Sequence, residues 1–277
     1  ASSMMVTKRD GSKEPISLDK ITNRVSVLST GLNIDPIVVV QKAVPGLYSD
    51  ISSVEIDTYL AETAAALTVE HPDYSYLAAR IKVNSLHKET PGFIIATKNL
   101  YDDGLLREDY YKKVMENADA IESVIDYDKD YTFDYFALTT LIRAYLLKFD
   151  NKTIERPQDL WMRVTLTVTG NEFNLDKIKE TYKNLSTGTY THATPTLFNS
   201  GLKMQQLSSC FLIGMEDDSI EGIFNTIKDC ALISKTAGGI GMHAHNIRGS
   251  GSRIKSTNGK SNGLIPFLKI FNETAKS

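Results

Sequence analysis

The stretch CFLIGMEDDSIEGIFNTIKDCALISKTAGGIGMH, residues 210–243, decides the fold of the C-terminal part of the chain. Its first six residues are mostly apolar and predict a strand. Asp218-Ser219-Ile220-Glu221 then predicts the start of a helix that continues to about residue 236, where Gly238-Gly239 ends it. The following IGMHAHNIR, residues 240–248, predicts a second strand. A strand, a helix and a strand in succession predict the beginning of a parallel α/β sheet or barrel.

The N-terminal residues 4–90 predict a small module that combines a hairpin with helices. MMVTKRDGSKEPISL, residues 4–18, predicts two short strands around Arg9-Asp10-Gly11, because Asp-Gly supplies the positive φ angles of a tight turn. Apolar runs that follow capping residues predict three helices. These are a helix capped by Asp19 that ends near Gly31, a helix to about Val69 opened by a Ser52–Glu55 capping box, and a helix from Tyr74 to His87 capped by Asp73.

The middle of the chain, from about residue 92 to 187, is predicted to be helical. The predicted helices are residues 107–123, 133–147, 157–169 and 175–186, the last capped by Asn174 or Asp176. THATPTLFN, residues 191–199, predicts a strand. The polar, Gly/Ser-rich stretch 248–263 predicts a loop before a helix from about Leu264.

Composition limits the class of protein. A length of 277 residues predicts two or three domains, and 42% hydrophobic with 23% charged residues is typical of globular proteins. The apolar runs are far shorter than the roughly 20 residues that span a bilayer. A net charge of −3 argues against a general nucleic-acid binder, although local basic clusters can still bind a small anion. Ala1-Ser2-Ser3 lacks the features of a signal sequence, so we expect a cytoplasmic protein with free or redox-active thiols.

The two cysteines differ in their surroundings. Cys210 lies between Ser208-Ser209 and an apolar run, and a cysteine beside apolar neighbours is most often a buried filler. Cys230 lies within a predicted helix, three residues from Ile227 and from Ile233, and is predicted to be in the core.

Other polar clusters leave alternatives open. Lys8, Arg9 and Gly11 at the hairpin tip could hold a phosphate or form a solvated turn. Asn258-Gly259-Lys260-Ser261 is no P-loop, because Ile254 stands where the motif needs glycine. The basic residues of that loop suit a phosphate, a mobile lid or a plain surface connection. His243 and His245 share one face of a predicted strand, but no further ligands have metal-site spacing nearby, so we expect no metal.

Seven stretches together resemble one family: KRDG, HPDYSYLAARI, THATPTLFNSG, QLSSCFL, DDSIEGI, SKTAGGIG and TNGKSNGLIPF. In this order and approximate spacing they resemble the large, catalytic subunit of class I ribonucleotide reductase of the eukaryotic type, from Val6 to Ser277. The resemblance implies an α/β protein with a mainly helical N-terminal half. Residues 4–91 would be an ATP-cone that senses ATP against dATP, 92–187 a helical region, and 188–277 the first part of a ten-stranded α/β barrel.

The resemblance also implies three sets of site residues. Cys210 would be one of two thiols that reduce a ribonucleoside diphosphate, forming a disulfide with a partner other than Cys230 as the 2′-hydroxyl leaves as water. The substrate would be lined by Thr194, where serine is more usual, Ser209 and Gly239. The allosteric activity site would comprise Lys8, Arg9, Glu14, Lys20, Ile21, Ser53, where threonine is commoner, Asp57 and Lys88. The specificity site would comprise Asp218, Ser219, Ile220, Lys235, Arg248, Ile254 and Asn262.

The chain departs from this family by ending at Ser277, before the radical cysteine and the second redox cysteine. We therefore expect it to be inactive alone and to need the C-terminal remainder of the large subunit. The resemblance implies a small subunit whose metal generates the radical, a homodimer or higher oligomer that uses helices around residues 220–236, and thioredoxin or glutaredoxin as reductant. ATP, dATP and other dNTP effectors, with Mg²⁺, would bind without a covalent cofactor. The alternatives are a non-catalytic nucleotide sensor and an interaction module with decayed sites.

Overall fold

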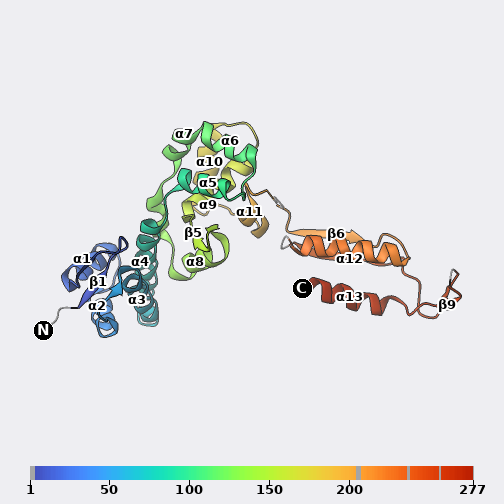
Figure 1. The fold of residues 1–277 in the computed structure, drawn as a ribbon, viewed down its shortest axis with the longest axis horizontal. Coiled ribbons are helices and arrows are strands. Elements are labelled where there is room, and N and C mark those ends of the chain that lie inside the picture. Colours follow the sequence, from blue (N-terminus) through green and yellow to red (C-terminus); the bar gives the residue numbers. More distant parts are fainter. Residues whose placement is uncertain (1–3, 204–206, 236–237, 256, 277) are drawn as a thin grey trace. The chain divides into compact units, whose positions relative to one another are not determined.

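The computed structural model describes residues 4–203, 207–235, 238–255 and 257–276. The chain forms two compact units (Figure 1). The N-terminal unit contains the residues up to 191 together with 201–203, and the C-terminal unit contains 192–200 and the residues after 203. Helices predominate, as the sequence predicts. Within the described ranges, no helix is both long and apolar enough to cross a membrane.

A three-stranded sheet opens the N-terminal unit. Strands β1 (Met5–Thr7) and β2 (Lys13–Pro15) pair antiparallel, and β3 (Ile51–Ser52) pairs parallel to β1. The predicted hairpin is therefore confirmed, whereas β3 was not predicted. The turn of this hairpin is closed by a hydrogen bond of 2.8 Å from the Lys8 N–H to the Ser12 carbonyl, and Gly11 in the turn adopts a φ of 84°.

Four helices share one hydrophobic core with this sheet: α1 (Leu18–Leu28), α2 (Pro36–Ala43), α3 (Ser53–Ala66) and α4 (Asp73–Glu89). The Ser52–Glu55 capping box is confirmed, and a 3-10 turn (η2, Leu67–Val69) follows α3. Helix α2 and the 3-10 turn after it (η1, Val44–Gly46) were not predicted. The core of this module includes Val25, Val39, Leu60 and Leu77.

Two predicted caps are wrong. The Ser17 hydroxyl, not Asp19, accepts the Lys20 N–H at 3.2 Å, because Ser17 immediately precedes the first helical residue and Asp19 already lies in the first turn. Asp73 is likewise the first residue of α4, and its carboxylate accepts the N–H of Asn33 at 2.9 Å. The predicted helices themselves are present in both cases.

The second half of the N-terminal unit is helical, as predicted, around a buried helix. Its helices are α5 (Phe93–Asp102), α6 (Glu108–Glu116), α7 (Ala118–Val124), 3-10 helix η3 (Tyr127–Thr132), α8 (Tyr135–Thr140), π-helix η4 (Leu141–Tyr145), α9 (Pro157–Val168) and α10 (Leu175–Ser186). The predicted helix 107–123 is interrupted at Asn117, and Asn174 caps α10. Helix α5 and the small hairpin of β4 (Lys148–Phe149) and β5 (Lys152–Thr153) were not predicted. Every residue of α9 from Pro157 to Leu166 is buried.

Partly buried polar contacts link the C-terminal end of α4, the 3-10 helix η3 and the start of α9. The Arg156 guanidinium donates to the carbonyls of His87 at 3.0 Å and Thr90 at 2.7 Å, so it satisfies carbonyls that the end of a helix leaves unpaired. Asp130 contacts His87 Nε2 at 2.7 Å, and Asp159 accepts the Tyr127 hydroxyl at 2.6 Å. The end of α4 is therefore held in place by side chains as well as by apolar packing.

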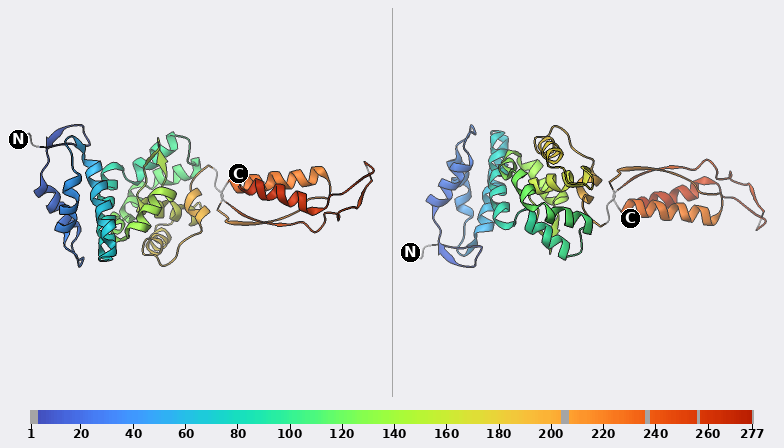
Figure 2. Two further views of the ribbon diagram at one scale, coloured as in Figure 1. Left: turned by 90° about the horizontal axis from the view of Figure 1, so that it is seen from below. Right: turned by 90° about the horizontal axis from the view of Figure 1, so that it is seen from above.

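The C-terminal unit contains the predicted strand, helix and strand. Strands β6 (Cys210–Gly214) and β7 (Gly239–His243) pair parallel, with α12 (Ile220–Lys235) between them in sequence. The predicted end of this helix at residue 236 lies outside the described residues. Helices α12 and α13 (Leu264–Lys276) lie along the two strands on one side (Figure 2). In the described residues this sheet has two strands and does not close a barrel.

Outside the strand–helix–strand segment, the C-terminal unit contains a helix and a hairpin that were not predicted. THATPTLFN is not a strand but contains helix α11 (Thr194–Asn199), because Pro195 suits the first turn of a helix and Leu197 is buried. The predicted polar loop contains a small hairpin of β8 (Arg253–Ile254) and β9 (Gly259–Lys260). Cys230 is confirmed as a core residue, in contact with a cluster that includes Met215, Ile223 and Phe271.

Candidate functional site

The hairpin, α1, α3 and α4 surround a cavity of about 240 Å³, here called the hairpin pocket. Six of the eight residues predicted for the activity site line it: Lys8, Glu14, Lys20, Ile21, Ser53 and Lys88. They come from four separate elements, and Lys88 is 80 positions from Lys8 in sequence. Arg24, which the sequence analysis missed, also lines this pocket. Its position four residues after Lys20 places both on one face of α1, which is the signal that could have identified it.

Positive charge dominates the hairpin pocket. Glu14 lies between two lysines, 3.0 Å from Lys8 Nζ and 3.5 Å from Lys20 Nζ, and the hydrogen bond from Lys8 lowers the pKa of Glu14. Burial, followed by the neighbouring Arg24, lowers the pKa of Lys88, although Asp57 opposes this effect. A polyanion in the pocket would relieve the repulsion among these cations. The charges therefore suit a ligand that carries several phosphates.

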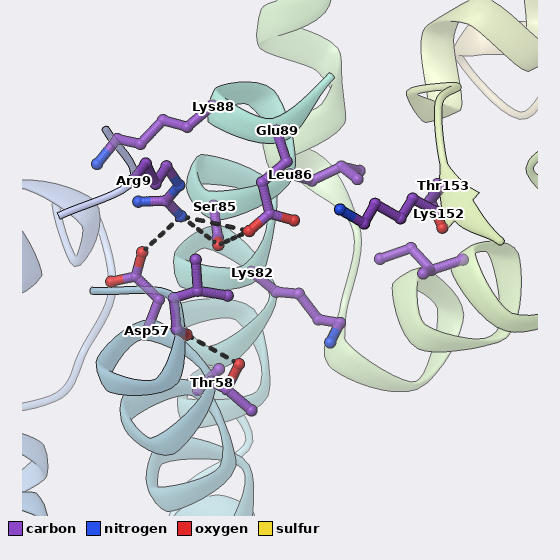
Figure 3. A pocket seen from close by; sticks show the side chains of 13 residues that line it. Arg9, Asp57, Thr58, Lys82, Ser85, Leu86, Lys88, Glu89, Lys152 and Thr153 are labelled. Carbon is purple, nitrogen blue, oxygen red and sulfur yellow. Dashed lines mark hydrogen bonds and ion pairs between the residues drawn. The ribbon is translucent and has the colours of Figure 1, made fainter. Parts of the chain in front are cut away.

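Arg9 and Asp57 do not line the hairpin pocket; they face a larger cavity beside α4. The side chains that line this α4 cavity are drawn in Figure 3. Its volume is about 660 Å³. The Asp57 carboxylate is only 2% exposed and forms ion pairs with Arg9, at 3.4 Å, and with Arg24. Lys88 lines both cavities. The eight predicted residues are therefore divided between two adjacent cavities that share Lys88 and are bridged by Asp57.

Cys210 is exposed at the start of β6, so it is not the buried filler considered as its alternative. It lies opposite Gly239 in the parallel pair, and the Gly239 N–H donates to the Ser209 carbonyl at 2.6 Å. A methyl group on Gly239 would lie 3.6 Å from Cys210 Sγ, so glycine leaves one side of the thiol open. The structure thus brings together Cys210, Ser209 and Gly239. Thr194, in the same unit, is exposed at the start of α11.

Of the predicted specificity residues, Asp218 and Arg248 are in direct contact. The Arg248 N–H donates to the Asp218 carboxylate at 3.2 Å, and its guanidinium pairs with the same carboxylate. Ser219 and Ile220 follow Asp218 directly. Lys235 is the last residue of α12, which places it about 22 Å along the helix axis from Ile220. The structure therefore brings together four of these residues and separates Lys235 from them within one chain.

The other two predicted specificity residues belong to the segment before α13. Ile254 is half-buried in β8 and pairs with Gly259 of β9, whereas Asn262 is exposed. The Arg253 guanidinium donates to the Asn258 side-chain carbonyl at 2.7 and 3.0 Å.

Among the described residues, histidine and carboxylate groups do not converge in the manner of a metal site. His243 Nδ1 and His245 Nδ1 are 2.9 Å apart on an exposed face. No cluster of three or more potential metal ligands is present in the part of the chain that the structure describes.

Comparisons with known proteins match three domain families in succession. These are the ATP cone domain, over residues 4–89, the ribonucleotide reductase all-alpha domain, over 131–205, and the ribonucleotide reductase barrel domain, over 208–277. Over 99% of its length the chain is 48% identical to ribonucleoside-diphosphate reductase large chain 2 of Saccharomyces cerevisiae, 46% to the large subunit of Arabidopsis thaliana and 47% to that of Variola virus. It spans 33%, 35% and 37% of these relatives, respectively.

Proposed function

The chain belongs to the ribonucleotide reductase large-subunit family, and on this premise we propose that it senses adenine nucleotides and supplies one reducing thiol for the reduction of ribonucleoside diphosphates. It spans about one third of the relatives that it matches, so we assign to it a share of the reaction. The observation that carries the proposal is the convergence of Lys8, Lys20 and Lys88 on one pocket of the ATP cone domain. We assign residues 4–91 to the cone, 92–187 to the helical region and 188–277 to the barrel.

The hairpin pocket is proposed to bind the triphosphate of ATP or dATP. Lys8, Lys20, Arg24 and Lys88 face the phosphates, Ser53 offers a hydroxyl, and Ile21 offers an apolar contact to the nucleoside. Mg²⁺ accompanies such nucleotides and is usually held largely by their phosphates. Arg9 and Asp57 are proposed to act indirectly. Asp57 forms ion pairs with both Arg9 and Arg24, and through the second pair it positions Arg24.

Cys210 is proposed to act as one member of a dithiol. Two thiols and the ribose 2′-hydroxyl group yield a disulfide, a C–H bond at C2′ and water, so two electrons pass from sulfur to the substrate. Cys230 is buried in the hydrophobic core of the C-terminal unit, and the sequence contains no third cysteine. We therefore assign the second thiol to polypeptide other than these 277 residues. Ser209, Gly239 and Thr194 would line the diphosphate substrate.

The specificity site and the partners follow from the same premise. Asp218 is proposed to exchange its bond to Arg248 for the deoxyribose 3′-hydroxyl of a dNTP effector, which frees Arg248 for the phosphates. Ser219, Ile220, Lys235, Ile254 and Asn262 would complete the response to this effector. The proposed partners are the C-terminal part of the large subunit, a metal-containing small subunit that generates the radical, a second copy of the large subunit, and thioredoxin or glutaredoxin.

A reconstitution experiment tests the proposal. The chain is mixed with the C-terminal segment of a related large subunit, a small subunit and dithiothreitol, and the formation of deoxyribonucleoside diphosphate is measured. We expect Cys210→Ser to reduce turnover below detection, because the serine hydroxyl cannot form a disulfide. Cys230→Ala is the matched control and should retain turnover if the fold is preserved. Turnover by Cys210→Ser equal to that of the control would contradict the redox assignment.

A further inference from the structure

The α4 cavity is large enough to hold a ligand of its own. Its volume of about 660 Å³ lies within the range of small-molecule sites. Helices α3 and α4, the π-helix η4 and strand β5 supply its walls, and all belong to the N-terminal unit. It combines apolar residues with hydroxyl groups and four cations. Its lining includes Arg9, Lys82, Ser85, Leu86, Lys152 and Thr153.

The two ends of the α4 cavity differ in charge balance. At one end, the Arg9 guanidinium donates to Asp57 at 3.4 Å, to Ser85 at 2.9 Å and to Glu89 at 3.5 Å, so both carboxylates that line the cavity are associated with a cation. At the other end, the ammonium groups of Lys82 and Lys152 project into the space between α4 and β5 (Figure 3). In the described part of the chain neither lysine has a carboxylate within ion-pair distance. This end therefore carries uncompensated positive charge.

We propose that the α4 cavity binds a small phosphorylated molecule, with its phosphate between Lys82 and Lys152. The Thr153 hydroxyl lies beside Lys152 on β5 and can donate to the same phosphate. Leu86, which is buried, and the half-buried Ile142 provide an apolar wall for the organic part of the ligand. The volume fits a molecule of nucleotide size and leaves too little room for an extended acidic peptide.

The α4 cavity is coupled to the hairpin pocket by shared groups, a step that rests on the proposed function of the hairpin pocket. Lys88 lines both cavities, and Arg9 and Arg24 share the Asp57 carboxylate. A bound ligand long enough to reach from Lys82 and Lys152 to Arg9 would draw this guanidinium away from Asp57, which leaves the carboxylate to Arg24 and gives Arg24 less freedom to meet a nucleotide. Two polyanions also compete for Lys88. Occupation of the α4 cavity is therefore expected to weaken dATP binding by a few-fold.

Lysine labelling of the full 277-residue chain tests the proposal with tripolyphosphate as the probe. An amine-reactive reagent is used with mass spectrometry to follow individual lysines. One charge-assisted contact with phosphate contributes about 1.5 kcal/mol, so saturation should slow labelling of Lys82 and Lys152 by about tenfold. Lys148, exposed on the same hairpin and outside the cavity lining, is the internal control and should be labelled at an unchanged rate.

Variants separate this proposal from the function of the hairpin pocket. Bound tripolyphosphate should slow amide hydrogen exchange at Leu86 and Ile142. The double variant Lys82→Gln/Lys152→Gln should abolish this slowing, whereas Lys148→Gln should retain it. Equal slowing of labelling at Lys148, or protection of Lys20 alone, would overturn the α4 site, and the second result would still leave the hairpin pocket supported. Protection of Lys82 and Lys152 by an acidic peptide but not by tripolyphosphate would also overturn it.

Discussion

Lys88 provides the most direct test of the hairpin pocket. It lies near the C-terminal end of α4, where Arg156 holds the backbone, and it lines the pocket beside Arg24 and Lys8. Lys88→Met removes the charge but keeps most of the length of the side chain. We expect the fold to be preserved, because the residue is exposed. The change therefore isolates the electrostatic contribution of this lysine to dATP binding.

The expected loss of affinity follows from one charge-assisted hydrogen bond. Such bonds contribute about 1.5–3 kcal/mol, and the exposure of Lys88 favours the lower value. A loss of about 1.5 kcal/mol corresponds to a dissociation constant for dATP about tenfold higher. Lys98→Met, a charge change at an exposed position of α5, is the matched control and should bind dATP as the wild type does.

Proton uptake provides a second, independent signature of Lys88. Although Lys88 is exposed by its accessible surface, the pocket walls partly desolvate its ammonium group, and this desolvation with the neighbouring cations lowers the pKa of Lys88 in the free protein; a bound triphosphate should raise it again. Between these two pKa values, binding takes up a proton. Affinity should therefore be greatest below the lowered pKa and fall as the pH rises through it. The phosphate groups themselves do not confuse this measurement at pH 9, because their last pKa is about 6.

Isothermal titration calorimetry measures both quantities. dATP is titrated at pH 7.5 and pH 9 in pairs of buffers that differ in ionisation enthalpy, which reports the number of protons taken up. The wild type and Lys98→Met should take up more protons at pH 9 than Lys88→Met. If Lys88→Met binds dATP within about twofold of the wild type and takes up the same number of protons, the assignment of Lys88 to the phosphates is refuted.

Two further predictions concern stability. Burial raises the pKa of Asp159 to about 7, above the ordinary value of 3.8, so the folded state keeps a proton that the unfolded chain loses and stability should fall as the pH rises from about 4 to 7. Urea unfolding at several pH values should show a shallower slope for Asp159→Asn, with exposed Asp176→Asn as the unchanged control; equal slopes would contradict this. Ser52→Ala removes an N-cap that accepts the Glu55 N–H at 3.1 Å and should cost about 1 kcal/mol in thermal unfolding, whereas no loss relative to Ser53→Ala would show that the cap is unimportant.

Most of the candidate site could be predicted from sequence only through family resemblance. Local chemistry alone left Lys8 and Arg9 open between a phosphate site and a solvated turn, because a hairpin tip looks the same in both cases. The structure places Lys8 in the hairpin pocket and Arg9 in the neighbouring α4 cavity, although the two residues are adjacent in sequence. Both residues lie after the end of β1, at the start of the hairpin turn, and which cavity each side chain meets depends on helices far along the chain.

The sequence by itself determined the features that depend on nearby residues. The hairpin around Gly11, the Ser52–Glu55 capping box and the strand–helix–strand order around α12 all follow from local patterns, and the structure contains each of them. The conformation of residues 194–199 was not fixed in this way, because a short apolar run suits either a strand or a helix until its burial is known. Tertiary structure alone decided that Asp57 bridges Arg9 and Arg24 and that Lys88 faces two cavities. Those contacts join residues more than 30 positions apart, and only the packing of α1, α3 and α4 brings their charges together.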